Sequence, residues 1–438
     1  MLGILPWLKS FNMTISLVSG LSKKKISVGP TPRKRLCDGA STLFDLIQRP
    51  ESLRNQVGLQ QPPLCQFLTE IWATRATDPR DLVFGLVNLT RDAGSPDFAP
   101  NYGDERDPVE FYTEICRRFL RRGELKSVLY VAGVGYPRTL NALPSWVPDW
   151  TCTPEMAPLK FRNYNASAHT ESHIELSLPG EISIGGIRFD TISATTSRCF
   201  PATWSDPKDR LGGKFISFCA TLLEALRMIE PLPQRYLSES INQSKTDAFW
   251  RTMVGDAMQV QLDHGQEQNL LSHGASTPMH LLRFNRPIPN EYGAILETWG
   301  PFLSSPQIEA LVAYRTLPNM PPSQPSFEEV FSRNKDLREL YEAVTSSAKD
   351  ILSCAGGRKF AITAKGYMAV VPPLADVGDE ISVLCGLEVL FVLRTDFCHR
   401  GGSGKVYNLV GEAYLHGIMD GEALCDELVE REERFRVV

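Results

Sequence analysis

Three side chains near the end of the chain have the types needed for acid–base or metal chemistry. Glu412, His416 and Asp420 lie within nine residues, and a carboxylate beside an imidazole can move protons or bind a metal ion. Along a strand these residues would cover roughly 26 Å at about 3.3 Å per residue, which is too long for one metal. A bend at Gly417 would bring them together. We interpret Glu412 as structural and His416 as a hydrogen-bonded core residue, and keep a site as the alternative.

A glycine-rich stretch near residue 400 contains part of a phosphate-binding pattern. Residues 401–405 read GGSGK, and the backbone amides of such a loop can hold phosphate while the lysine reaches it. His399 stands where the first glycine should be, and Val406 follows the lysine where Ser or Thr should hold magnesium. Strands are also expected on both sides. We interpret the stretch as a hairpin loop and expect no cofactor.

A helix start signal precedes the apolar run at residues 82–89. Asp78 can accept hydrogen bonds from the first free amides, and Pro79 suits the first helical position. Asp81 adds a second carboxylate at the positive end of the helix. Arg80 has no explanation in this pattern, so a polar site formed by Asp78, Arg80 and Asp81 stays open as the alternative.

Two tryptophans lie in the segment LPSWVPDW, residues 143–150. Its two prolines favour an extended backbone. An amphipathic helix is predicted over residues 108–121, because apolar residues recur on one side of it. We expect Trp146 and Trp150 to dock on the helices as anchors.

Recognisable nucleophiles are missing from the sequence. Its serines occur in no G-x-S-x-G elbow, and none of the ten cysteines forms a C-x-x-C pair. We therefore expect reduced cysteines, no catalytic residue, no cofactor and no metal.

The charge balance excludes a general nucleic-acid binder. The 438 residues include 46 Lys and Arg against 51 Asp and Glu, a net charge of −5. Six basic residues nevertheless cluster in the segment Lys23–Arg35, which is either an exposed arm or a nuclear import signal. The apolar start of the chain is interrupted by Pro6, Lys9 and Asn12, so we expect no membrane span and a cytoplasmic protein.

The pattern of apolar residues predicts an α+β fold. Alternation at 173–192 and again after 357 predicts short antiparallel strands, with breaks at Pro179–Gly180 and Gly185–Gly186. Helical spacing between 210 and 353 predicts an insertion. Strands on both sides of it should pair in one domain, because three short strands alone would be marginal. The charged residues after Asp420 predict a helix.

Several segments together resemble the fungal heterokaryon incompatibility (HET) domain proteins. They occur in the family's order along the chain and read ATDPRDLVFGLVNL (76–89), LPSWVPDW (143–150), AFWRTMVGD (248–256), KFAITAKGYMAVVPPLADVGDEISVL (359–384) and YNLVGEAYLHGIMDGEAL (407–424).

The resemblance implies an intracellular fungal protein of non-self recognition that acts in programmed cell death signalling through a protein partner, without nucleic acid. It implies no established reaction. The HET domain is distantly similar to Toll/interleukin-receptor domains, some of which cleave NAD, so an NAD-cleaving enzyme is the alternative function. The family's opening motifs are not found before Pro62, and we therefore expect a truncated or modulatory form.

The expected organisation follows from this resemblance and from the patterns. The fold is α+β, with a mainly helical N-terminal remnant of an α/β domain followed by a small antiparallel β domain with a helical insertion. The expected parts are a basic, loosely structured segment (1–42), the C-terminal part of the HET domain (43–158), a β domain (159–424) interrupted by the insert (210–353), and a charged tail (425–438). The family-motif residues, interpreted as structural, are Asp78, Arg80, Asp81, Trp146, Asp149, Trp150, Trp250, Glu412, His416 and Asp420.

Overall fold

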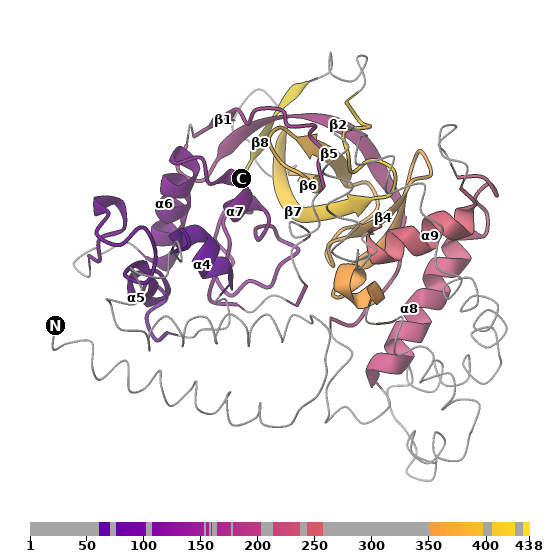
Figure 1. Ribbon diagram of the computed structural model, residues 1–438, viewed down its shortest axis with the longest axis horizontal. Coiled ribbons are helices and arrows are strands. Elements are labelled where there is room, and N and C mark those ends of the chain that lie inside the picture. Colours follow the sequence, from indigo (N-terminus) through magenta and orange to yellow (C-terminus); the bar gives the residue numbers. More distant parts are fainter. Residues whose placement is uncertain are drawn as a thin grey trace, which may run out of the picture. The chain divides into compact units, whose positions relative to one another are not determined.

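The chain forms two compact units of different composition. The first comprises Met1–Val128, Pro137–Leu143 and Val147–Pro154, and the second Leu129–Tyr136, Pro144–Trp146 and Glu155–Val438. The computed structural model describes residues 61–70, 76–101, 107–152, 155–156, 159, 164–176, 178–202, 213–236, 243–256, 348, 350–396, 405–424 and 432–438. Helices predominate in the N-terminal part and an antiparallel sheet in the C-terminal part (Figure 1), which confirms the α+β class.

The described helices of the N-terminal part are short except for α6. α6 (Pro108–Arg121) begins and ends where the apolar spacing predicts, and the Asp107 side chain accepts a hydrogen bond from the amide of Glu110 at 2.8 Å. The others are α4 (Leu64–Glu70), α5 (Asp81–Val87), the 3-10 helix η2 (Pro96–Phe98) and α7 (Leu125–Leu129).

Asp92 holds two of these helices together. Its buried carboxylate accepts from the first amide of α4, at Leu64, over 2.7 Å, and pairs with Arg122, which follows α6, over 2.6 Å. The Arg122 guanidinium also lies over the Phe98 ring, 5.2 Å from its centroid. One carboxylate thus joins the start of α4 to the end of α6.

Eight strands of the second unit form one sheet. Their hydrogen-bonded order is β1-β2-β3-β4-β7-β6-β5, and β5 pairs back with β2, so six strands close a ring. Strands from both sides of the helical insertion pair directly, which confirms the expected single β domain. The strands are β1 (Ile174–Glu175), β2 (Ile182–Thr195), β3 (Lys359–Thr363), β4 (Met368–Val371), β5 (Glu380–Leu384), β6 (Leu390–Thr395), β7 (Val406–Leu415) and β8 (Glu433–Val437).

The predicted strand break at Gly185–Gly186 is wrong, because both glycines lie inside the 14-residue strand β2. A Cβ at Gly186 would lie 2.4 Å from the carbonyl oxygen of Val383 on β5. A Cβ at Gly185 would lie 2.7 Å from a carboxylate oxygen of Glu432. Glycine is present here because other chain segments approach closely, and not because the chain turns.

The charged helix predicted after Asp420 is also wrong where the structure describes the chain. Residues 433–437 form β8, which is antiparallel to β2 and parallel to β7. Phe435 and Val437 are buried while the intervening Arg434 and Arg436 are more exposed, as expected for a strand with one face in the core.

Two described helices belong to the insertion. α8 (Gly213–Ile229) and α9 (Lys245–Val254) agree with the helical spacing expected between residues 210 and 353. α9 ends at Gly255, which adopts a left-handed conformation with φ of 66°. Most of the expected insertion (210–353) lies outside the described residues, as do the segment 1–42 with its basic cluster Lys23–Arg35 and the glycine-rich residues 401–404. None of the described helices is both long and apolar enough to cross a lipid bilayer.

We predict that Gly186→Ala lowers the free energy of unfolding by about 1–3 kcal/mol or more, because β2 and β5 must separate to admit the methyl group. Gly180→Ala is the matched control, since its Cβ would meet Pro144 at an ordinary 3.7 Å. Urea denaturation of both variants measures the effect. Equal stability of Gly186→Ala and the wild type would contradict the close approach.

Candidate functional site

Glu412 lies on β7 in a fully buried ion pair. Its Oε1 is 2.5 Å from Nη2 of Arg358, and both side chains are inaccessible to solvent. Arg358 also donates from Nη1 to the Glu412 carbonyl oxygen at 2.9 Å, and the amide of Leu159 donates to Oε1 at 2.6 Å. The carboxylate therefore joins β7 to the residue before β3 and to the loop at Leu159.

The electrostatics of this pair favour two fixed charges. Burial alone would lower the pKa of Arg358, but the negative charge of Glu412 outweighs it and the pKa is raised. Burial raises the pKa of the neighbouring Tyr136 well above its ordinary value, and its hydroxyl donates to the Tyr130 carbonyl oxygen at 2.8 Å. These groups stabilise one another and are shielded from a substrate in water.

His416, just after β7, is hydrogen-bonded through both ring nitrogens. Nδ1 lies 3.0 Å from the Tyr414 hydroxyl and Nε2 lies 2.9 Å from Oε1 of Gln243. Burial, with a smaller contribution from the charge of Arg251, lowers the pKa of His416 to about 3. The ring is therefore neutral at physiological pH, which agrees with the expected core histidine.

Tyr236 completes the contact between β4 and the end of β7. The His416 amide donates directly to the Met368 carbonyl oxygen at 3.0 Å. The opposite bond of such an antiparallel pair is replaced by the Tyr236 hydroxyl, which accepts from the Met368 amide at 3.0 Å and donates to the His416 carbonyl oxygen at 3.1 Å. Tyr236 and Gln243 thus attach the helical insertion to the sheet.

Asp420 is not part of the cluster around Glu412 and His416. It is partly exposed, and its amide donates to a carboxylate oxygen of Glu422 at 2.7 Å. The chain does turn at Gly417, with φ of 87°, but Glu412, His416 and Asp420 have different partners. In the described part of the chain, no group of three His, Cys, Asp or Glu side chains could hold a metal ion.

Trp250 is buried on α9 and belongs to an aromatic cluster. Its ring is nearly perpendicular to that of Phe249, with centroids 5.0 Å apart. Phe249 in turn meets Phe360 on β3 with centroids 5.3 Å apart. Phe249 therefore packs α9 against the sheet, and Trp250 packs beside Phe249.

The Asp78 motif is explained by local contacts. The carboxylate accepts from the Arg80 amide at 3.0 Å and pairs with the Arg80 guanidinium, with Nη2 and Oδ2 2.7 Å apart. The hydrogen bonds from the Arg80 side chain lower the pKa of Asp78. α5 begins at Asp81 and its N-cap residue, Arg80, makes no side-chain capping hydrogen bond, so the expected helix start at Pro79 with Asp78 as the cap is wrong, whereas Asp81 does lie in the first turn. The ion pair with Asp78 gives Arg80 a structural role that sequence reasoning did not find.

The two tryptophans of the LPSWVPDW segment are both buried, but they belong to different units. Trp150 packs against Tyr112 of α6, with ring centroids 5.1 Å apart, which confirms docking on a helix. Trp146 is grouped with the β unit, where its Nε1 donates to the Gly180 carbonyl oxygen at 3.0 Å. Docking of Trp146 on the helices stays a prediction.

Asp149 organises the backbone around it. Its Oδ2 accepts from the amides of Thr139 and Leu140 at 2.7 and 2.8 Å, and Oδ1 accepts from the Thr151 amide at 3.0 Å. Burial raises the pKa of Asp149, but these hydrogen bonds together outweigh it, so the pKa is lowered. The carboxylate is an acceptor for loop amides.

Sequence reasoning missed the partners of the buried charges. Arg358 follows Gly356–Gly357 and lies 54 residues from Glu412. Arg251 pairs with Asp256 across the end of α9, with Nη1 and Oδ1 2.9 Å apart and both side chains nearly buried. The alternating strand after Arg358 marks a core, but no local signal shows that a charge enters it.

We predict that Arg358→Met costs about 3–5 kcal/mol of stability, because it leaves the Glu412 carboxylate charged, buried and without its cation. The double variant Arg358→Met/Glu412→Leu should lose less than the sum of the two single variants, since neither charge is then stranded. Urea denaturation of the four proteins measures the coupling. Additive losses would show that the two residues do not act as a pair.

We predict that His416 makes the free energy of unfolding depend on pH. The pKa of His416 falls from an ordinary 6.5 in the unfolded chain to about 3 in the folded protein. Between these two values the unfolded state binds a proton and the folded state does not. Acidification therefore lowers the free energy of unfolding by up to about 1.4 kcal/mol per pH unit. His416→Gln lacks this loss. The stability advantage of the wild type over His416→Gln should shrink between about pH 8 and about pH 5, and a constant difference would contradict this assignment.

The comparisons with known proteins agree with the resemblance described above. Residues 334–437 match the family model of the Het-6 beta-barrel domain, so β2 completes the closed sheet from outside the matched range. The chain is 22% identical over 423 residues to heterokaryon incompatibility protein 6, OR allele, of Neurospora crassa. That similarity covers 91% of this chain and 57% of the relative. No solved structure matches the chain. The chain is therefore similar over most of its length to a heterokaryon incompatibility protein, and its C-terminal part is similar to the Het-6 beta-barrel domain.

Proposed function

We propose that this protein acts in fungal heterokaryon incompatibility, as a non-self recognition protein whose engagement leads to programmed cell death. The observation that carries the proposal is the similarity to heterokaryon incompatibility protein 6 over 91% of the chain, together with the Het-6 beta-barrel match. Because the chain spans 57% of that relative's length, the shared activity is itself part of the proposal. We place it in the cytoplasm.

The geometry of the motif residues favours binding over catalysis. Glu412 accepts from Arg358 and Leu159, and His416 has a partner at each ring nitrogen. Asp149 accepts from three backbone amides. Side chains used in this way stabilise a scaffold and hold no proton or nucleophile ready for a substrate. We therefore propose a scaffold that recognises a protein partner, and NAD cleavage has no described side-chain arrangement in its favour.

We predict that deleting the gene in its own fungus makes at least one incompatible pairing of strains viable, and that reintroducing the full chain restores cell death. Pairings are scored by heterokaryon growth and by vital-dye staining of fusion cells. Gly180→Ala should complement as well as the wild type.

Two results would contradict the proposal. Unchanged pairings after deletion would remove the role in incompatibility. Release of nicotinamide when the purified chain is incubated with NAD would favour the enzymatic alternative.

A further inference from the structure

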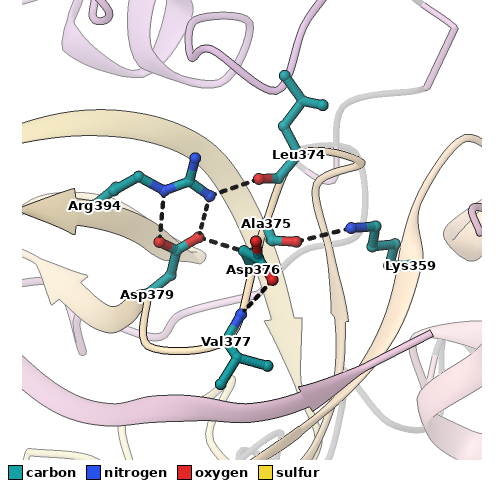
Figure 2. Close-up of polar contacts among 7 residues, drawn as sticks. All are labelled: Lys359, Leu374, Ala375, Asp376, Val377, Asp379 and Arg394. Carbon is teal, nitrogen blue, oxygen red and sulfur yellow. Dashed lines mark hydrogen bonds and ion pairs between the residues drawn. The ribbon is translucent and has the colours of Figure 1, made fainter. Parts of the chain in front are cut away.

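The loop between β4 and β5, residues 372–379, is braced from three strands of the sheet. The carboxylate of Asp379 pairs with Arg394 of β6 through both oxygens, each 2.8 Å from a guanidinium nitrogen. Lys359 of β3 donates to the Ala375 carbonyl oxygen at 3.0 Å, as Figure 2 shows. The Gly378 amide donates to Ile192 of β2 at 2.9 Å.

Contacts within the loop fix its backbone further. Arg394 also donates to the Leu374 carbonyl oxygen at 2.7 Å, and Asp379 accepts from the Asp376 amide at 2.9 Å. The Asp376 carboxylate accepts from the next amide, at Val377, over 2.8 Å. Gly378 has φ of 92°, a conformation that side-chain-bearing residues rarely adopt. The loop is therefore held in one conformation.

This rigid loop presents apolar side chains to water. Leu374 is 56% exposed and Val377 is 60% exposed, whereas Ala375 and Asp379 between and beside them are buried. In Figure 2 the Leu374 and Val377 side chains point away from each other, on opposite sides of the loop. The exposed residue between them in sequence is Asp376, which carries the negative charge of the loop tip.

A braced loop with exposed apolar side chains has the properties of a binding element. Its backbone is already ordered, so association costs little conformational entropy. Burying two aliphatic side chains supplies the favourable free energy. Because the two point in opposite directions, a flat surface would touch one of them, whereas the walls of a groove would contact both.

We propose that the β4–β5 loop inserts into an apolar groove of a second, different protein, and that a Lys or Arg of that groove pairs with Asp376. The basic residue follows from charge complementarity, since the exposed carboxylate between the two apolar side chains would otherwise lose water without a partner. The proposal deepens the proposed function by locating its partner-binding element, and rests on it for the identity of the pathway.

The test compares three full-length variants with the wild type in the deletion strain. Leu374→Ser/Val377→Ser removes the apolar contacts, Asp376→Lys reverses the charge, and Leu178→Ser is the control because Leu178 is equally exposed elsewhere in the sheet unit. All three should melt within about 2 °C of the wild type, since surface changes cost little. We expect the first two to lose at least tenfold in the frequency of incompatible cell death, and Leu178→Ser to retain it.

The charge prediction has its own readout. Selection for restored cell death with Asp376→Lys should yield a Lys or Arg changed to Asp or Glu in another gene. In parallel, a photoreactive phenylalanine derivative placed at position 374 or 377 of the otherwise wild-type chain should form one adduct in living hyphae. That adduct should be lost when Asp376→Lys is added and should not form from position 178.

The outcomes separate the two proposals. If deletion has no phenotype but the Asp376-dependent adduct forms, the function is wrong and the loop assignment stands. Full cell death with a correctly folded Leu374→Ser/Val377→Ser overturns the loop assignment. A wild-type dimer in sedimentation that this double variant dissociates also overturns it, because the occupant would then be a second copy.

Discussion

Arg358 and Glu412 neutralise each other where water reaches neither side chain, and the sheet depends on that pairing. Neither charge can be buried alone, because an isolated ion in a protein interior costs far more than most contacts return. The ion pair therefore requires Arg358, just before β3, to lie beside Glu412 of β7 in the folded sheet. The Leu159 amide then binds the same carboxylate, so a third segment is positioned by the same constraint.

The pairing of β4 with β7 is the shortest in the closed ring of strands, and it shows how the helical insertion stabilises the sheet. β4 and β7 share two residue pairs in their ladder, Ala369 with Leu415 and Val370 with Tyr414. The Tyr236 hydroxyl extends this short ladder by bridging Met368 and His416. A side chain from the inserted segment thus supplies a hydrogen bond that the strands do not make directly, and the insertion is part of the sheet's stability.

The spacing of apolar residues along the chain predicted individual helices and strands. The apolar stripe was sufficient for α6, because one face of that helix is buried. β7 was also predicted, although both of its faces are buried. β8 was missed because its charges, Arg434 and Arg436, were weighed above the alternation of Phe435 and Val437. The glycine pair of β2 predicts a turn from sequence, because a turn and the close approach of another strand both favour glycine. The pairing of Arg358 with Glu412 is set by the tertiary fold, and its partners lie 54 residues apart.

The position of β8 has a consequence for biosynthesis. Ser145 donates its amide to the Val438 carbonyl oxygen at 2.8 Å, yet 293 residues separate the two. During translation, β2 leaves the ribosome long before β8, so one of its edges stays open until the chain has been synthesised to that point. Open strand edges pair with other chains. A chain that stops before residue 433 would therefore leave residues 182–186 of β2 without the pairing that β8 provides.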